Sequence, residues 1–168
     1  MAIRYQLIER PPTALWNVLD DPSRFADWVV GTDESGPREG SWPELGSSLT
    51  YTVRLGPRVA EGYTVVRRYE PPQYLELEAH TGVGTARIAF DIRPWGEGTL
   101  VILDEHPLSG LGNQLHNVVL DALIQLRHRG MLPRLARLVA ETNPEPEPAD
   151  AGTGSPTRSR ISGEAGHD

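Results

Sequence analysis

The hydrophobic pattern divides the chain into one long helical segment and a series of alternating strands. Residues 114–140 carry apolar side chains at the i, i+3, i+4 spacing of a single buried helix face. Its members are Leu115, Val118, Val119, Ala122, Leu123, Leu126, Met131, Leu135, Leu138 and Val139. Residues 46–106 instead alternate apolar and polar positions, which is the period of a strand with one buried face. The pattern therefore predicts one long helix packed against a sheet.

The alternating part predicts several strands, and turn residues separate them. The strands are expected at residues 2–9, 48–55, 59–70, 74–80, 85–93 and 99–106. Two short helices are expected after the first strand, over residues 13–19 and from Pro22 onward, since proline favours a helix start. Residues 31–46 are dense in Gly, Pro, Ser and Glu, and we expect mostly loop there, with a short strand at the beginning. The close spacing of the turns favours an antiparallel meander, so the predicted class is α+β.

The chain is expected to form one domain followed by a tail. Residues 1–141 are long enough to bury a substantial core. Residues 142–168 contain almost no apolar side chains and many Pro, Gly, Glu and Ser, which predicts a disordered acidic tail. From Glu141 onward, six acids against two arginines carry −4 of the chain's net charge of −7.

Composition removes several classes of function. The absence of cysteine excludes disulfides, thiolate nucleophiles and iron–sulfur clusters, and all 16 basic residues are arginine, which excludes a Schiff-base lysine and a P-loop. The negative charge argues against a nucleic-acid partner. His106, His116, Asp104 and Glu105 match no metal-ligand spacing. We expect no metal and no cofactor, no membrane insertion because no apolar run approaches about 20 residues, and a cytoplasmic location because the opening residues lack a signal-peptide pattern.

Three stretches carry a resemblance to a known family. They are RPPTALWNVLDDPSRFADWVVG, EPPQYLELEA, and GEGTLVILDEHP followed by the long helix. This order over residues 2–141 resembles the SRPBCC superfamily of START-like helix-grip proteins, and in particular its small polyketide cyclase/dehydrase-like members. The resemblance implies a curved antiparallel sheet wrapped around the C-terminal helix, with a ligand between them. It leaves the reaction open, because the superfamily contains cyclases, lipid carriers and hormone-binding proteins.

Alternation also predicts which side chains face the helix. The candidate ligand-binding residues are Trp42, Leu49, Tyr51, Val53, Leu77, Ile88, Phe90, Leu103, Asn117 and Asp121. An apolar set with few polar members suits the binding of a hydrophobic or aromatic small molecule. The alternative is that these side chains simply fill the core of the protein. For residues 59–70 the inward set is ambiguous, so either Arg67 or Arg68 is open to the cavity.

Glu105 and Tyr51 are the candidate catalytic residues. A carboxylate among apolar side chains is costly to ionise, which is how an enzyme obtains a general acid or base near neutral pH. The alternative is that Glu105 sits at the strand end, solvated or paired with an arginine. The Tyr51 hydroxyl either orients a substrate or lies in water.

Three further candidates have equally plain alternatives. Trp42 either closes the cavity as a lid or packs its loop onto the body. Asn117 and Asp121 lie four residues apart and either face the cavity or belong to a solvated helix face.

Three functional hypotheses follow from these patterns. The first is a small-molecule binding protein with a hydrophobic or aromatic ligand between sheet and helix. The alternative is a polyketide aromatase/cyclase-like enzyme that uses the same cavity. A third possibility is a protein whose surface matters more than its cavity, and both a monomer and a homodimer stay open.

Overall fold

The computed structural model describes residues 2–55, 57–82, 84–109 and 118–144, and for residues 2, 55, 58, 109 and 118–129 it describes the backbone only. The elements in chain order are β1 (Ala2–Ile8), α1 (Pro12–Leu19), the single 3-10 turn η1 (Pro22–Arg24), α2 (Phe25–Trp28), β2 (Thr32–Glu39), β3 (Ser48–Leu55), β4 (Arg58–Glu70), β5 (Tyr74–Thr81), β6 (Gly84–Trp95), β7 (Gly98–Ser109) and α3 (Val118–Thr142).

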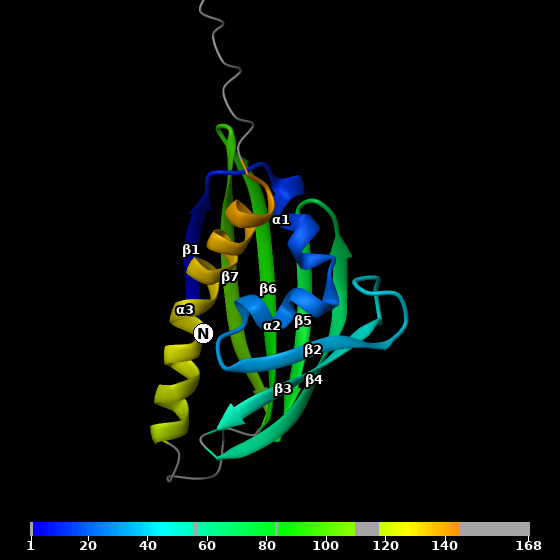
Figure 1. The fold of residues 1–168 in the computed structure, drawn as a ribbon, viewed down its shortest axis with the longest axis vertical. Coiled ribbons are helices and arrows are strands. Elements are labelled where there is room, and N and C mark those ends of the chain that lie inside the picture. The colour runs from blue at the N-terminus through cyan, green and yellow to red at the C-terminus, as the bar shows by residue number, and fades with distance from the viewer. Residues whose placement is uncertain (1, 56, 83, 110–117, 145–168) are drawn as a thin grey trace, which may run out of the picture.

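The seven strands form one antiparallel sheet in the order β1-β7-β6-β5-β4-β3-β2. Hairpins join β2 through β7 in sequence. The last of these strands, β7, pairs with β1, which forms the other edge of the sheet. Figure 1 shows α1, α2 and α3 gathered on one side of the curved sheet, and α3 lies against β1, α1 and α2. The predicted α+β helix-grip architecture, with two short helical segments after the first strand, is confirmed.

The strand β2 lies where a short strand was predicted, at the beginning of residues 31–46, but it extends over eight residues of a segment expected to be mostly loop. Residues 32–39 pair with β3 although they include Gly36 and Pro37, and the register shifts twice along the pair. An edge strand hydrogen-bonds on one side only, so it tolerates proline and polar side chains that a central strand would reject. The polar pattern therefore did not show how far this strand extends, because the strand packs no apolar row of its own.

The C-terminal half of α3 packs its apolar side into the core as predicted. Met131, Leu135 and Val139 are buried, together with Leu132. The helix runs on through Gly130 and Pro133. A Cβ on Gly130 would lie 2.9 Å from the Val30 side chain, so the glycine allows α3 to approach the chain close to β2.

A bulge in β4 settles the ambiguity over its two faces. Thr64 and Val66 are buried on the helix side, and the register then shifts by one residue between Val66 and Arg68. The extra residue restores Tyr69 to the inner face. Arg67 and Arg68 both remain exposed and ion-paired on the outside, so neither arginine enters the space under the helices.

Aromatic side chains from α2 cover the middle of the sheet. Trp28 meets Phe90 edge to face, with ring centroids 5.8 Å apart, and Phe25 stacks on Tyr51 at 5.4 Å. The Tyr51 ring in turn lies over Gly62 of the neighbouring strand, where a Cβ would stand 2.6 Å from a ring carbon. Gly62 is therefore required by close packing, since any side chain there would displace the tyrosine.

The outer face of the sheet holds a network of charges around Arg87. Its guanidinium donates to Glu76 at 2.7 Å and to the Tyr74 hydroxyl at 3.0 Å, and it approaches Asp104 at 3.3 Å. The hydrogen bond from Arg87 is the main cause that lowers the pKa of Glu76, and the pKa of Arg87 is raised by the same contact. These shifted groups lie on the side away from the helices and act structurally.

We expect Gly62→Ala to destabilise the fold. The added methyl group overpacks the Tyr51 ring, which costs about 1–3 kcal/mol in a well-packed core. Urea unfolding measures the free energy of unfolding. Gly36→Ala is the control, because a Cβ at Gly36 meets nothing within 4 Å. Equal stability of the two variants would contradict the packing described for Tyr51.

We expect Glu76→Gln to lower stability at neutral pH only. The folded-state pKa of Glu76 lies below its unfolded value, so its contribution is present above the unfolded pKa and disappears as the pH falls through the folded pKa. For a half-buried pair the loss at pH 7 is about 1 kcal/mol. Urea unfolding of the variant and the parent should differ at pH 7 and converge toward low pH. Glu61→Gln, an exposed position with no ion pair among the described residues, should show no such pH-dependent difference.

Candidate functional site

The concave face of the sheet is filled at one end and open at the other. Leu75, Phe90 and Leu103 form one cross-strand row and are fully buried. Farther toward the turn between β5 and β6, the paired side chains of Ala79 and Ala86 on the same face are only half-buried. Ile88, in the row between them, is also half-buried. The open end therefore presents an apolar floor that the described helices leave partly accessible.

Glu105 lies in the row of Ile88, at the border between the filled and the open end. Its residue is 5% exposed, and its cross-strand neighbours are Ile88 on β6 and Ala2 on β1. The alternative of a solvated Glu105 at a strand end is wrong, because the residue is buried and β7 continues to Ser109. The longer strand carries the carboxylate into the interior, among apolar neighbours.

Tyr51 approaches the same region from β3. The side chain is buried between Phe25 and Gly62, and its hydroxyl points to the backbone carbonyl of His80 on β5, at 3.5 Å. The Tyr51 hydroxyl therefore does not lie in bulk water, which was the alternative. A long hydrogen bond of this kind leaves the hydroxyl able to turn toward another partner.

Two buried polar groups were missed by sequence reasoning. Trp28 is 3% exposed, and its indole N–H has no hydrogen-bond partner among the described residues. The Thr32 hydroxyl is similarly buried and without a partner there, and Thr32 pairs with Val53 on the inner face. An unmade hydrogen bond costs about 1–3 kcal/mol, so such groups point to a further partner. Helical periodicity could place Trp28 inside but could not show whether its N–H is satisfied.

The remaining predicted residues divide into three groups. Leu49, Leu77, Phe90 and Leu103 are fully buried and Val53 nearly so, which places them in the packed core rather than on an accessible wall. Trp42 is half-buried and donates its indole N–H to the Leu19 carbonyl at 2.9 Å, which fastens the loop between β2 and β3 to the end of α1. Asn117 and the side chain of Asp121 lie outside the described part of the chain.

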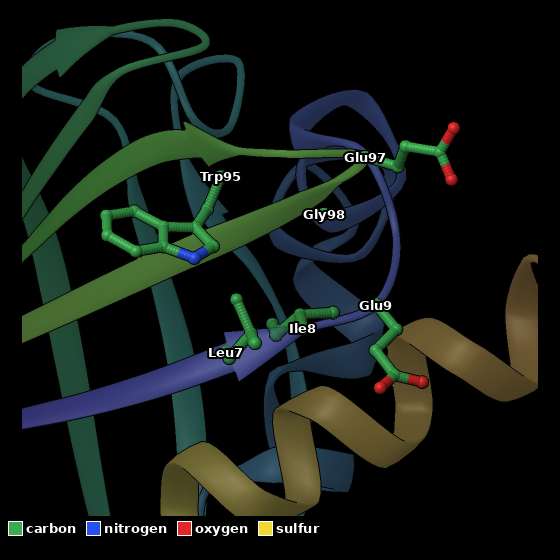
Figure 2. Close-up of a pocket in the computed structure, with 6 residues that line it drawn as sticks. All are labelled: Leu7, Ile8, Glu9, Trp95, Glu97 and Gly98. Carbon is green, nitrogen blue, oxygen red and sulfur yellow. The ribbon is translucent and has the colours of Figure 1, made fainter.

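Two hollows on the described surface lie elsewhere. One, of about 300 Å³, is lined by Leu7, Ile8, Glu9, Trp95, Glu97 and Gly98 (Figure 2). The other, of about 260 Å³, is on the outer face and is lined by Ile3, Tyr74, Ala89, Asp91, Ile102 and Asp104. Neither lies between the sheet and α3. At the open end of the concave face, β7 leads into residues 110–117, which lie outside the described residues.

The described ranges contain neither a cluster of metal-binding side chains nor a helix that could span a membrane. Within residues 2–55, 57–82, 84–109 and 118–144, no three histidine or carboxylate side chains gather in a way that could hold an ion. The helices of these ranges include none with the length and apolarity needed to cross a bilayer.

Solved structures share the fold at low sequence identity. Protein CV1439 from Chromobacterium violaceum superposes with a TM-score of 0.63 at 13% identity, covering 82% of this chain and 96% of that one. Ara h 8.0201 gives a TM-score of 0.67 at 10% identity, with coverage of 83% and 97%. DynU16, from the dynemicin biosynthetic locus, gives 0.59 at 21% identity, and the match covers 85% of this chain and 48% of DynU16. At these identities the likeness shows the fold alone.

The sequence itself matches a family across nearly all of the folded part. No curated protein matches the chain significantly. The family described as "Polyketide cyclase / dehydrase and lipid transport" matches residues 4–140. This range includes every helix and strand except the ends of β1 and α3. The resemblance to SRPBCC proteins is thereby confirmed, and the chain belongs to the polyketide cyclase/dehydrase and lipid transport family.

Proposed function

We propose that the protein binds a hydrophobic or aromatic small molecule at the open end of the concave face. The observation that carries this proposal is the half-buried apolar floor of Ala79, Ala86 and Ile88, which continues a face that is otherwise fully covered. Apolar surface left accessible inside a curved sheet favours an apolar ligand, because its burial stabilises the complex by about 25 cal/mol per Å².

Three polar groups border this floor and orient the bound ligand through hydrogen bonds. The Trp28 N–H is a donor without a partner among the described residues, and the Tyr51 hydroxyl can donate or accept. The Glu105 carboxylate accepts when it is ionised. Few polar groups among many apolar ones are typical of sites that hold a ring system carrying one or two oxygens.

The comparisons support the same class of ligand. The family description names polyketide cyclisation, dehydration and lipid transport, all of which concern largely apolar molecules. DynU16 comes from a locus for dynemicin biosynthesis. We infer by analogy that this chain also binds a largely apolar molecule.

A second candidate function, cyclisation and dehydration of a poly-β-ketone, is favoured by the buried carboxylate. In this mechanism Glu105 removes a proton from a carbon between two carbonyls of the bound chain, and the resulting enolate attacks a second carbonyl to close a ring. The Tyr51 hydroxyl or the Trp28 N–H stabilises the developing negative charge on oxygen. Protonated Glu105 returns this proton to the alkoxide formed by ring closure, which gives a hydroxyl group. Glu105 then removes the second proton from the same carbon and passes it to the hydroxyl, which leaves as water as the carbon–carbon double bond forms.

We expect Ala86→Phe to block binding of a neutral aromatic probe. The larger ring fills the floor without opening a void, so the affinity for 1-aminoanthracene, measured by fluorescence titration, should fall at least tenfold. Val59→Phe is the matched control, since Val59 is an exposed apolar residue on β4, and it should leave the affinity unchanged. Undiminished binding by Ala86→Phe, with an unchanged unfolding midpoint, would place the ligand elsewhere.

Glu105→Gln separates binding from catalysis. If the protein is a cyclase, the variant should retain its affinity for 1-aminoanthracene within about threefold but lose roughly 10²–10⁴ in the rate of ring closure of a poly-β-ketone thioester, the usual loss for a general base. Product formation followed by mass spectrometry gives the rate. Unchanged turnover removes Glu105 from the mechanism, and absence of turnover in the parent protein leaves the binding function alone.

A further inference from the structure

An exposed tryptophan marks a surface that the small-molecule site does not use. Trp95, at the end of β6, is 61% exposed, and Leu7 on the edge strand β1 is 49% exposed. Together with Ile8 and Gly98 they line the hollow of about 300 Å³ shown in Figure 2, here called the Trp95 hollow. A large exposed aromatic beside aliphatic side chains is typical of a surface that receives a partner.

The rim of the Trp95 hollow is negatively charged. Glu9, directly after β1, and Glu97, in the turn between β6 and β7, line it, and Figure 2 shows both carboxylates at the same end of the hollow. Both are exposed, and neither forms an ion pair with any described residue. Figure 2 shows the Trp95 indole at the other end of the hollow. A hollow with an indole at one end and two carboxylates at the other suits a pair of cations with aliphatic stems, and guanidinium groups stack on indole especially well.

The last described residues of the chain lie close to this hollow. The Arg10 guanidinium, one residue after Glu9, donates a hydrogen bond to the Asn143 carbonyl at 2.6 Å. Asn143 follows the last residue of α3, and its side chain also reaches the Ala14 carbonyl at 3.4 Å. Residues 145–168, which lie outside the described part, therefore begin next to the rim.

The sequence beyond Asn143 contains one segment that matches the hollow in charge. Glu145, Glu147 and Asp150 come first, and Glu164 and Asp168 come last. Between these acids, residues 151–163 contain only two charged side chains, Arg158 and Arg160, and next to them stands Ile161, the one large aliphatic residue in 145–168. The segment TRSRI over residues 157–161 thus combines two guanidinium groups with an apolar side chain.

The connection is long enough for this segment to reach the hollow. Arg158 is 14 residues beyond Pro144. A coil of that length spans about 20 Å root-mean-square, and an extended chain reaches roughly 45 Å. A tether of this kind gives an effective concentration on the order of millimolar, so even a weak contact is occupied.

We propose that residues 157–161 dock in the Trp95 hollow of the same chain. One arginine stacks its guanidinium on the Trp95 indole while the second meets the carboxylates of Glu9 and Glu97, and the contact covers the exposed aromatic surface. Arginines two residues apart project to the same side of an extended segment, about 7 Å apart, which lets both reach one rim.

Paramagnetic labelling of the full chain tests the docking. The sequence has no cysteine, so Ser159→Cys gives a single attachment site for a nitroxide between the two arginines. Ser155→Cys is the matched control, closer to the anchored end. Docking predicts that the label at 159 broadens the Trp95 indole and Leu7 amide NMR signals at least threefold more than the label at 155. A tail without a docking site gives the reverse order, since the nearer label stays closer on average, and that result overturns the proposal.

Two further measurements identify the interaction and the occupant. Adding Arg158→Glu and Arg160→Glu to the Ser159→Cys chain should abolish the excess broadening, as should 0.5 M salt, which screens exposed charges. Persistence of the broadening in that variant overturns the assignment to the arginines. Broadening that appears in an isotope-labelled chain mixed with a nitroxide-labelled second copy, and is absent within one chain, assigns the hollow to the tail of another molecule and likewise overturns the proposal.

Discussion

The structure depends on the contact between the short helix α2 and the middle of the curved sheet. A seven-stranded sheet that curves presents one long apolar face, and a single helix cannot cover all of it. Phe25 and Trp28 fill the centre by stacking on Tyr51 and Phe90. This contact divides the concave face, because everything on the α1 side is closed by packed side chains while the side toward the β5–β6 turn keeps an accessible apolar floor.

That division explains why alternation along the strands predicted the fold well and the site poorly. The period of two identified Leu49, Leu77, Phe90 and Leu103 as inward, and all are. The alternation could not show which inward residues contact α2 and which face open space, since that depends on which part of the sheet this four-residue helix covers. Position along the strand, rather than face, separates a core residue such as Phe90 from an accessible one such as Ile88.

Local irregularities account for the other differences. The polar edge strand β2 needs no apolar row, so the sequence indicated only a short strand there. The bulge at Arg67 and Arg68 reversed the faces of β4 within one strand. The strand predicted over residues 99–106 leaves Glu105 at a strand end. Pro107 is instead paired within β7, opposite Ala86. Each of these features is decided by neighbours on another strand, which a single sequence does not display.

The pairing of β1 with β7 also bears on how the protein is made. Ala2 lies opposite Glu105 and Ile8 opposite Thr99, so β1 leaves the ribosome well before its partner, which is about 100 residues later in the chain. Contacts so distant along the chain close slowly, since a long loop must be ordered before they form. Until β7 has emerged, the backbone N–H and C=O groups of β1 have no partner strand to pair with. The same strand that completes the fold is therefore the segment of the nascent chain most in need of protection.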